Sequence, residues 1–461
     1  MSAYAGARLV PFWLDRPDAP APAPPLTGDA TCDLAIVGGG FTGLWAAILA
    51  KQDDPARDVV LLEGDTVAFG GSGRNGGFVD ASLTHGLPNG LARFPDEIDE
   101  LERLGLENLA GIEETLERFS IDAAYEKTGF LLAAREPHEA EELSEFAELL
   151  RERETDAEYL DQAAVRRELD SPTYIAGLWQ RTGNAIVDPA RLAWGLARAA
   201  AELGVRIHEH SPVTSLVDTP GGAELTVGGA RLRARRVVLA TNGFPPLVRA
   251  IRRYVVPVYD YVLVTEPLSA EQRAAIGWAH RQGTGDCTNQ FHYYRLTEDD
   301  RILWGGYDAI YHYGNAVAPR LEDRDATYSL LSEHFFQTFP QVEGLTFTHR
   351  WAGVIDTCSR FCVMWGTALS DKAAYAVGYT GLGVASTRFG ARVALDLVDG
   401  LDTERTRLRF VRSKPLPFPP EPLRWAGIQL TRRALDRADR NQGRRGVWLR
   451  TLDRFGLGFD S

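Results

Sequence analysis

The sequence predicts an α/β fold, in which a discontinuous Rossmann-like domain of parallel strands is interrupted by an inserted α+β part with an antiparallel sheet. Three glycine-bearing stretches are spread from one end of the chain to the other. Apolar strands expected within 33–63, 205–241 and 374–377 are typical of buried parallel strands and belong in one sheet. Aromatic-rich strands are expected between 250 and 345. They must therefore form an insertion between parts of the first domain.

The first glycine stretch has the sequence of a dinucleotide-binding turn. The apolar strand 34–37 leads into Gly38-Gly39-Gly40-Phe41-Thr42-Gly43, and an apolar helix follows from Leu44. Glycines at this spacing permit the tight turn, the close approach of a pyrophosphate, and close packing of helix on strand. A second strand, 59–62, ends at Glu63, twenty residues after Gly43. An acid there accepts hydrogen bonds from a ribose diol and repels a 2′-phosphate.

The other two glycine stretches extend this site. They are Ser72-Gly73-Arg74-Asn75-Gly76-Gly77 and Gly378-Tyr379-Thr380-Gly381-Leu382-Gly383. Three such stretches, so far apart in the chain, favour one long cofactor held along its whole length, namely FAD. A helix expected from Leu382 to Val398 would place its N-terminal dipole near the negative charge of a reduced flavin.

The remaining elements follow from periodicity and capping residues. Helices are expected at 98–119 and 136–168, and another begins at Asp188-Pro189 and runs to Glu202. Strands are expected at 125–134, 205–207, 236–241, 259–265, 291–296 and 302–307. The predicted FAD-binding domain comprises residues 1–122, 188–247 and 346–415, the substrate domain comprises 123–187 and 248–345, and a C-terminal helical extension covers 416–461.

Composition excludes several classes of function. A net charge of −13 is unfavourable for nucleic-acid binding, and no apolar run is long enough for a transmembrane helix. With no secretory signal and four cysteines that form no metal-ligand pattern, we expect a cytoplasmic protein with reduced thiols and no metal site. Pairing of Cys358 with Cys362 remains open. The segment from Arg424 to Arg454 carries nine Arg and three Asp. It predicts a helix packed on the acidic body, with an oligomer contact or an anionic membrane surface as alternatives.

Nearly the whole chain up to about residue 400 resembles the D-amino acid oxidase superfamily of FAD enzymes, which includes glycine and sarcosine oxidases. Within it, Ser72–Gly77 and Tyr293-Tyr294-Arg295 resemble the γ-glutamylputrescine oxidase-like branch. The resemblance implies oxidation of an amine C–N bond to an imine by hydride transfer to flavin N5, then hydrolysis and reoxidation by O2. Two alternatives are a D- or N-alkyl amino acid dehydrogenase that uses an electron carrier, and a flavin-binding module without redox turnover.

The resemblance also implies which residues contact FAD. Gly38, Gly40, Phe41, Thr42 and Gly43 would hold the pyrophosphate, Glu63 the ribose, and Ser72, Gly73, Arg74, Asn75, Gly76 and Gly77 the pyrophosphate and flavin edge. The backbone of Val213 would pair with the adenine, Thr241 and Gly243 would close over the adenosine, and Gly381, Leu382, Gly383 and Val384 would meet the flavin pyrimidine and ribityl chain. Gly353 stands where some relatives carry a flavin-linking Cys, so we expect non-covalent FAD.

Three departures from the sarcosine oxidase pattern bear on the substrate. Asp80 stands where that group has a carboxylate-binding Arg, Ala385 stands where it has a second carboxylate-binding residue, a Lys, and Leu303 lies near the position of its oxygen-activating Lys. Replacing two cations by Asp80 and Ala385 removes the means of binding an α-carboxylate and favours a cationic substrate. A plain loop-capping role for Asp80 is the alternative.

Aromatic side chains are expected to form the wall of the substrate pocket, where they can hold a cationic amine. They are Tyr259, Tyr261, Tyr294, Trp351 and Tyr379, with His292 beside them. Arg295 and Arg350 are the candidates for binding an acidic group, such as the distal carboxylate of a γ-glutamyl conjugate. Ordinary packing of these aromatic residues in the core, and ion pairing of the two arginines within the fold, are the alternatives.

Overall fold

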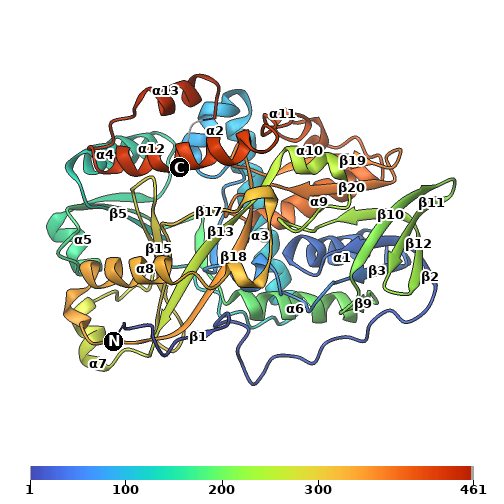
Figure 1. Cartoon of the computed structure of the whole chain (residues 1–461), viewed down its shortest axis with the longest axis horizontal. Coiled ribbons are helices and arrows are strands. Elements are labelled where there is room, and N and C mark those ends of the chain that lie inside the picture. The colour runs from blue at the N-terminus through green and yellow to red at the C-terminus, as the bar shows by residue number, and fades with distance from the viewer. Residues whose placement is uncertain (1, 458–461) are drawn as a thin grey trace.

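The computed structural model describes residues 2–457 and contains two large sheets. Figure 1 shows the smaller sheet at the right of the molecule, around β2, β3 and β12. Its strands, in spatial order, are β10 (Val213–Thr219), β11 (Gly222–Val227), β12 (Ala230–Leu239), β2 (Ala30–Val37), β3 (Val59–Leu62) and β9 (Arg206–His208). β20 (Ala373–Val377) pairs with β12 and with β19 (Met364–Ala368). The β2, β3, β9, β12 and β20 strands run parallel, as the sequence predicts.

Four helices form the core on one face of the smaller sheet. They are α1 (Phe41–Asp53), α3 (Ile98–Arg118), α6 (Pro189–Glu202) and α9 (Ser386–Val398). α1 packs against both α6 and α9, and α3 packs against α9. Nearly every residue of α1 is buried, because this apolar helix is covered by the sheet and by both neighbouring helices. The carboxyl ends of β2 and β3 thereby meet the N-terminus of α1, where nucleotides bind in such sheets.

The larger sheet has the spatial order β1, β18, β13, β16, β15, β14, β5, β7, β6. The strands are β1 (Arg8–Leu9), β18 (Phe347–Cys358), β13 (Val255–Thr265), β16 (Ile302–Gly306), β15 (His292–Leu296), β14 (Gly283–Asp286), β5 (Phe130–Ala134), β7 (Ala176–Gln180) and β6 (Ala157–Asp161), with β17 (Ile310–Tyr311) paired to β13. Most of its pairs are antiparallel, whereas β1–β18 and β5–β14 are parallel. An aromatic core that includes Tyr294, Trp304 and Phe335 lies on one face, under α8 (Asp325–Thr338).

Shorter elements connect these layers. A two-stranded sheet joins β4 (Phe78–Asp80) to β8 (Asn184–Ile186). The remaining helices are α2 (Leu87–Arg93), α4 (Pro137–Glu152), α5 (Gln162–Glu168), α7 (Ala270–Ile276), α10 (Glu404–Arg407), α11 (Arg409–Arg412), α12 (Leu423–Asp439) and α13 (Val447–Arg454). Turns of 3₁₀ helix occur at Gly71–Gly73, Pro95–Glu97, Arg249–Arg253, Tyr313–Asn315, Pro319–Leu321 and Pro340–Val342. In Figure 1 the C-terminal helices α12 and α13 lie along the top, beside α4 and α2.

Several predicted elements are confirmed and several have different bounds. The helix at 98–119 is α3, and the Asp188 side chain caps α6 by accepting from Ala190 N and Arg191 N, as predicted. The predicted strand 125–134 is regular only from Phe130, and the predicted helix 136–168 is interrupted by β6. β6 was missed because the acidic and basic residues around it favour helix over strand. The helix expected from Leu382 begins at Ser386.

The predicted division into domains remains a proposal. Strand pairing bears on the predicted boundary at residue 346. β18 lies C-terminal to this boundary, in the predicted FAD-binding domain, yet it pairs antiparallel with β13 of the predicted substrate domain along almost its whole length. This strand therefore belongs to the larger sheet, and the chain returns to the smaller sheet only at β19 and β20.

Candidate active site

The turn after β2 requires glycine at positions 38 and 43. A Cβ atom on Gly43 would lie 1.9 Å from the carbonyl oxygen of Gly38, and one on Gly38 would lie 2.4 Å from that of Ala240. Gly38 also has a φ of 115°, which side-chain-bearing residues rarely adopt. The backbone of the turn and of the start of α1 consequently lies in direct contact with the backbone at the ends of β2 and β12. With no side chains on these glycines, a phosphate group can approach the N-terminus of the helix.

Glu63 lies directly beside this turn at the end of β3. Its carboxylate accepts hydrogen bonds from Gly39 N at 2.6 Å and from Asp65 N at 2.9 Å. Burial raises the pKa of Glu63, which the backbone donors partly oppose. The predicted arrangement of turn, helix and acid is therefore present, and the carboxylate lies where it could bind ribose hydroxyls.

The second glycine stretch is attached to the first by a side chain. Ser72 Oγ accepts a hydrogen bond from Phe41 N at 2.8 Å, at the start of α1. Asn75 holds the loop itself, since its Nδ2 donates to the carbonyls of Gly71 and Ser72 and its Oδ1 accepts from Gly77 N. The loop is thus fixed close to the N-terminus of α1.

The third stretch follows β20 and is fixed by Asp356 of β18. The Asp356 carboxylate accepts from Gly378 N at 2.6 Å and from Tyr379 N at 3.1 Å. Burial raises the pKa of Asp356 to about 7. Because α9 starts at Ser386, Leu382 and Gly383 lie in the connection before the helix and not in its first turn.

A cavity of about 1600 Å³ runs past all three stretches. It is larger than the roughly 300–1000 Å³ typical of a site for one small molecule, so it can contain a dinucleotide and a substrate together. Of the predicted cofactor residues, those that line it are Gly40, Phe41, Thr42, Ser72, Arg74, Asn75, Gly76, Gly353, Gly381, Leu382, Gly383 and Val384.

The other predicted cofactor residues are not part of this lining. They are Gly38, Gly43, Glu63, Gly73, Gly77, Val213, Thr241 and Gly243. Four of the glycines among them serve backbone packing: besides Gly38 and Gly43, a Cβ on Gly73 would lie 2.4 Å from Ala68 O and one on Gly77 would lie 2.1 Å from Val187 O. Val213 starts β10, and its predicted contact with adenine remains a prediction.

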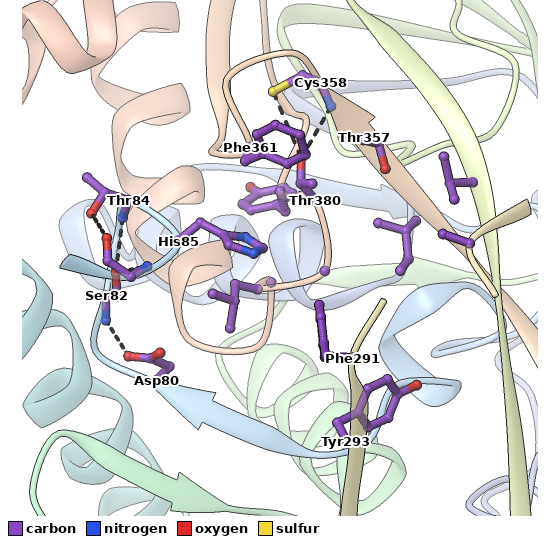
Figure 2. A pocket seen from close by; sticks show the side chains of 18 of the residues that line it. Asp80, Ser82, Thr84, His85, Phe291, Tyr293, Thr357, Cys358, Phe361 and Thr380 are labelled. Carbon is purple, nitrogen blue, oxygen red and sulfur yellow. Dashed lines mark hydrogen bonds between the residues drawn. The ribbon is translucent and has the colours of Figure 1, made fainter. Parts of the chain in front are cut away.

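Asp80 and Tyr379 are the predicted pocket residues that line the cavity. Asp80 ends β4, and its Oδ1 accepts from Ser82 N at 2.7 Å, so the loop-capping role is present in the structure. Within residues 2–457 its carboxylate has no ion-pair partner, and burial raises its pKa. Figure 2 shows Asp80 and His85 on one loop of the pocket, with His85 directed toward its middle.

Sequence reasoning missed His85. Its backbone has a φ of 63°, and its Nδ1 is buried with no hydrogen-bond partner in the described part of the chain. The ring lies 6.3 Å from that of Phe361, and burial lowers the pKa of His85 to about 4. A single His in a polar loop gives no sign in the sequence that its side chain will be buried in a cavity. The following Gly86 indicates only an unusual turn.

The other predicted pocket residues point away from the cavity because side chains alternate along a strand. Tyr259 and Tyr261 of β13 face the aromatic core, where their hydroxyls bond to Ala318 and to Leu321 O. The residue between them, Asp260, lines the cavity, and so does Tyr293 on β15. Tyr294 instead bonds to Tyr174 in the core. The strands named in the prediction thus contribute Asp260 and Tyr293 to the cavity wall, while Tyr259, Tyr261 and Tyr294 pack in the aromatic core.

Four further predicted pocket residues are not part of the cavity lining and have structural partners within the fold. Trp351 Nε1 donates to Arg74 O at 2.8 Å, and His292 Nδ1 lies 2.7 Å from Asp286, where both side chains are buried. The guanidinium of Arg295 donates to the carbonyls of Gly77 and Val187, and burial lowers its pKa to about 10. Arg350 lies 3.3 Å from Asp323 and over the ring of Tyr328. The alternative of packing and pairing within the fold thus describes all four.

The C-terminal extension forms part of the cavity wall. Residues lining it from this segment include Ile428, Leu435 and Trp448. Asp439 at the end of α12 accepts from Asn289 N and Gln290 N on the loop before β15. Packing of a helix on the body, the first of the three sequence interpretations, is observed.

Within residues 2–457, no helix combines the length and the apolar character that a bilayer crossing requires. Over the same range, no three His, Cys, Asp or Glu side chains are grouped so as to hold a metal ion. The four cysteines are free, and Cys358 Sγ lies 3.1 Å from the carbonyl oxygen of Cys362.

Comparisons with known proteins agree with this geometry. The family model described as "DAO: FAD dependent oxidoreductase" matches residues 33–397. The chain is 32% identical over 413 residues to gamma-glutamylputrescine oxidoreductase of Escherichia coli K12, covering 87% of this chain and 90% of that protein. It is 29% identical over 395 residues to the probable oxidoreductase OrdL of Haemophilus influenzae, covering 83% and 86% of the two chains.

Among solved structures, glycine oxidase from Geobacillus kaustophilus superposes with a TM-score of 0.68 at 20% identity, covering 83% of this chain and 98% of that one. That similarity shows the fold. The glycine turn, the acid after β3 and the three glycine stretches along the cavity suit FAD binding, and all of them lie within the residues that the family model matches. The chain therefore belongs to the DAO family of FAD-dependent oxidoreductases.

Proposed function

We propose that this oxidoreductase acts on a cationic amine or amine conjugate and oxidises its C–N bond to an imine, which water then hydrolyses. The observation that carries the proposal is Asp80, a carboxylate without an ion-pair partner among residues 2–457 in the wall of the cavity. Burial disfavours the anionic form of a carboxylate unless a positive group or hydrogen-bond donors compensate, and a substrate ammonium group would supply the positive charge. The E. coli relative is named for an amine conjugate, which supports the same class.

The surroundings of Arg295, Arg350 and Arg74 do not favour an α-carboxylate substrate. Arg295 is enclosed by backbone carbonyls, and Arg350 contacts Asp323 and Tyr328 outside the cavity lining. Ala385, at the position of a carboxylate-binding Lys in sarcosine oxidases, is buried and has no charge. Arg74, which does line the cavity, is engaged with Glu322 at 2.6 Å.

The chain contributes orientation and the exclusion of water. FAD, when bound, supplies the hydride acceptor. Asp80 would bind an ammonium group of the substrate, and apolar residues such as Leu382 and Val384 would exclude bulk water from the reacting bond. Gly353 offers no sulfur for a covalent flavin link, so the cofactor would be held non-covalently.

Anaerobic reduction of the bound flavin, followed at about 450 nm, tests the proposal with a panel of diamines, γ-glutamyl amines, D-amino acids and N-methyl amino acids. We expect bleaching by the cationic amines, with KM raised about 10- to 100-fold in Asp80→Asn, as for loss of a charged hydrogen bond. Asp402→Asn, an exposed carboxylate paired with Arg407, is the matched control. Bleaching only by D- or N-methyl amino acids would favour the dehydrogenase alternative.

The electron acceptor is tested in the same cuvette. We propose O2, so readmitting air should restore the oxidised spectrum within the turnover time. Slow recovery that an added electron carrier accelerates would instead identify a dehydrogenase. No bleaching by any donor would leave a flavin-binding module without redox turnover. A cytoplasmic location is also part of the proposal, consistent with four free cysteines, and assembly through the C-terminal extension remains a prediction.

A further inference from the structure

Another carboxylate of the cavity wall lies on the larger sheet. Asp260 of β13 lines the cavity and accepts a hydrogen bond from the hydroxyl of Tyr293 on β15. Its cross-strand neighbour on β18 is Gly353, so both lie on the same face of the sheet. A Cβ on Gly353 would lie 3.3 Å from Arg74 Cβ in the second glycine stretch. Asp260 is therefore on the part of the wall that adjoins the cofactor-binding loops.

The position of Tyr293 is fixed by its surroundings. Cβ atoms on Gly76 and on Gly305 would lie 2.9 Å and 2.6 Å from atoms of the Tyr293 ring, so both positions must be glycine for the ring to fit. Phe78 packs against the ring edge-on, with centroids 5.6 Å apart. Asp80 follows two residues after Phe78 on the same strand. Figure 2 shows Tyr293 and Asp80 in the same pocket, and the hydroxyl of Tyr293 is committed to Asp260.

No cation neutralises Asp260 within the described residues. The groups that face it are the Tyr293 hydroxyl from β15 and the backbone N–H groups of Tyr261 and Gly306. From β18 the neighbouring residue is the uncharged Gly353, and the nearby guanidinium of Arg74 is bonded to Glu322, Phe69 O and Ala352 O. Tyr307, which follows Gly306, also lines the cavity. A carboxylate with this surrounding accepts a proton more readily than one in water.

We propose that Asp260, held in place by Tyr293, is the group that accepts the ammonium proton of the amine substrate, so that the reacting nitrogen is neutral. This inference rests on the proposed function. In the step, an N–H bond of R–CH2–NH3⁺ breaks, its electron pair stays on nitrogen, and an O–H bond forms on Asp260. Charge is conserved and nothing is oxidised or reduced. Asp80 would then bind a second polar or cationic group of the same substrate.

Two physical effects favour this transfer inside the cavity. Burial raises the pKa of Asp260 to about 6, against the smaller lowering effect of the Tyr293 hydrogen bond. Burial also lowers the pKa of an ammonium group, because a low-dielectric site disfavours both ions. The neutral amine and carboxylic acid are therefore stabilised relative to the ion pair, and a neutral amine carries the lone pair that assists hydride loss.

The test is the pH dependence of anaerobic flavin reduction by an amine that reduces the wild-type holoenzyme. The wild-type rate should fall at low pH, as Asp260 becomes protonated. In Asp260→Asn the wild-type midpoint should be lost, the rate at pH 8 should fall at least 100-fold, and the rate should instead rise with pH in proportion to the neutral amine present in solution. In Tyr293→Phe the midpoint should move to higher pH, because the carboxylate loses a donor that favours its ionised form.

A second readout does not depend on turnover. A tertiary-alkyl amine without an α C–H bond, such as tert-butylamine, cannot be oxidised, and its binding can be followed by calorimetry. We expect Asp260→Asn to weaken it about 10- to 100-fold and Asp402→Asn to leave it unchanged. A wild-type midpoint retained in both Asp260→Asn and Tyr293→Phe would overturn the inference while leaving the proposed function intact. Failure of every amine to reduce the wild-type flavin would instead remove the proposed function.

Discussion

The hydroxyl of Thr42 donates a hydrogen bond to the hydroxyl of Tyr379 at 2.9 Å, although the two residues are 337 positions apart in the chain. Thr42 lies in the first turn of α1, and Tyr379 lies in the third glycine stretch, after β20. Both line the cavity, and the ring of Tyr379 is almost fully buried. This bond joins the pyrophosphate end of the proposed FAD site to the end expected at the flavin.

Tyr379→Phe should weaken FAD binding without loss of the fold. The substitution removes one buried hydrogen bond of about 1 kcal/mol and leaves the ring in place, so we expect the Kd for FAD to rise roughly fivefold. Fluorescence quenching of free FAD on titration with apoprotein measures it. Tyr313→Phe, on an exposed tyrosine, is the control. An unchanged Kd would show that the bond does not organise the site.

Gly43→Ala should abolish FAD binding and lower stability. A Cβ at this position would overlap the carbonyl oxygen of Gly38 at 1.9 Å, so α1 would have to move away from β2. We expect a loss of several kcal/mol, as for overpacking of a backbone contact. Urea denaturation of the apoprotein and the flavin content of the purified variant measure the two effects. Gly28→Ala, on an exposed glycine outside the cavity where an added Cβ has open space, should change neither.

Local signals predicted the nucleotide-binding part of the fold because each signal lies within a few residues. Asp188 and Pro189 mark the start of α6, and the spacing from Gly38 to Glu63 predicts the strand–helix–strand unit. The start of α9 could not be placed so well. Its first residue is set by the path of the chain after Gly383, which includes a hydrogen bond from Thr387 N to Gly383 O.

The residues that line the substrate pocket were harder to predict, because a strand that is apolar on both faces shows no alternation of polar and apolar residues. In β13 the residues Tyr259, Asp260 and Tyr261 give no sign of which face meets the cavity. Tertiary pairing decides it: the hydroxyl of Tyr261 reaches Leu321 O, and Asp260 is left on the opposite face. The unpaired state of His85 is likewise a property of the assembled cavity, visible only once Phe361 is placed beside it.

Arg295→Met should destabilise the second glycine loop without changing the substrate preference. The guanidinium donates to Gly77 O at 3.1 Å and to Val187 O at 2.7 Å and lies over Trp13. Removing it leaves Val187 O without this donor, whereas Gly77 O still accepts from Val187 N at 2.8 Å, and we expect a loss of about 1–3 kcal/mol in the free energy of unfolding. The ranking of amines in the flavin-reduction panel should stay the same. A selective loss of acidic substrates would instead assign Arg295 to substrate binding. Arg233→Met, on an exposed arginine of β12, controls for loss of a charge.

The stability of the holoenzyme should fall between about pH 4 and pH 7 because of Asp356. Its pKa is raised to about 7 by burial, from 3.8 in the unfolded chain, so the folded state binds the extra proton across this range. The stabilisation by that proton is present below the unfolded pKa and is lost as the pH rises through the folded pKa, with an upper bound of about 4 kcal/mol. Asp356→Asn carries no titrating proton and retains one acceptor for Gly378 N or Tyr379 N. Its Tm should therefore be lower than that of the wild type at pH 5 and approach or exceed it at pH 8. A difference in Tm that does not change with pH would mean that Asp356 titrates at its ordinary pKa despite its burial.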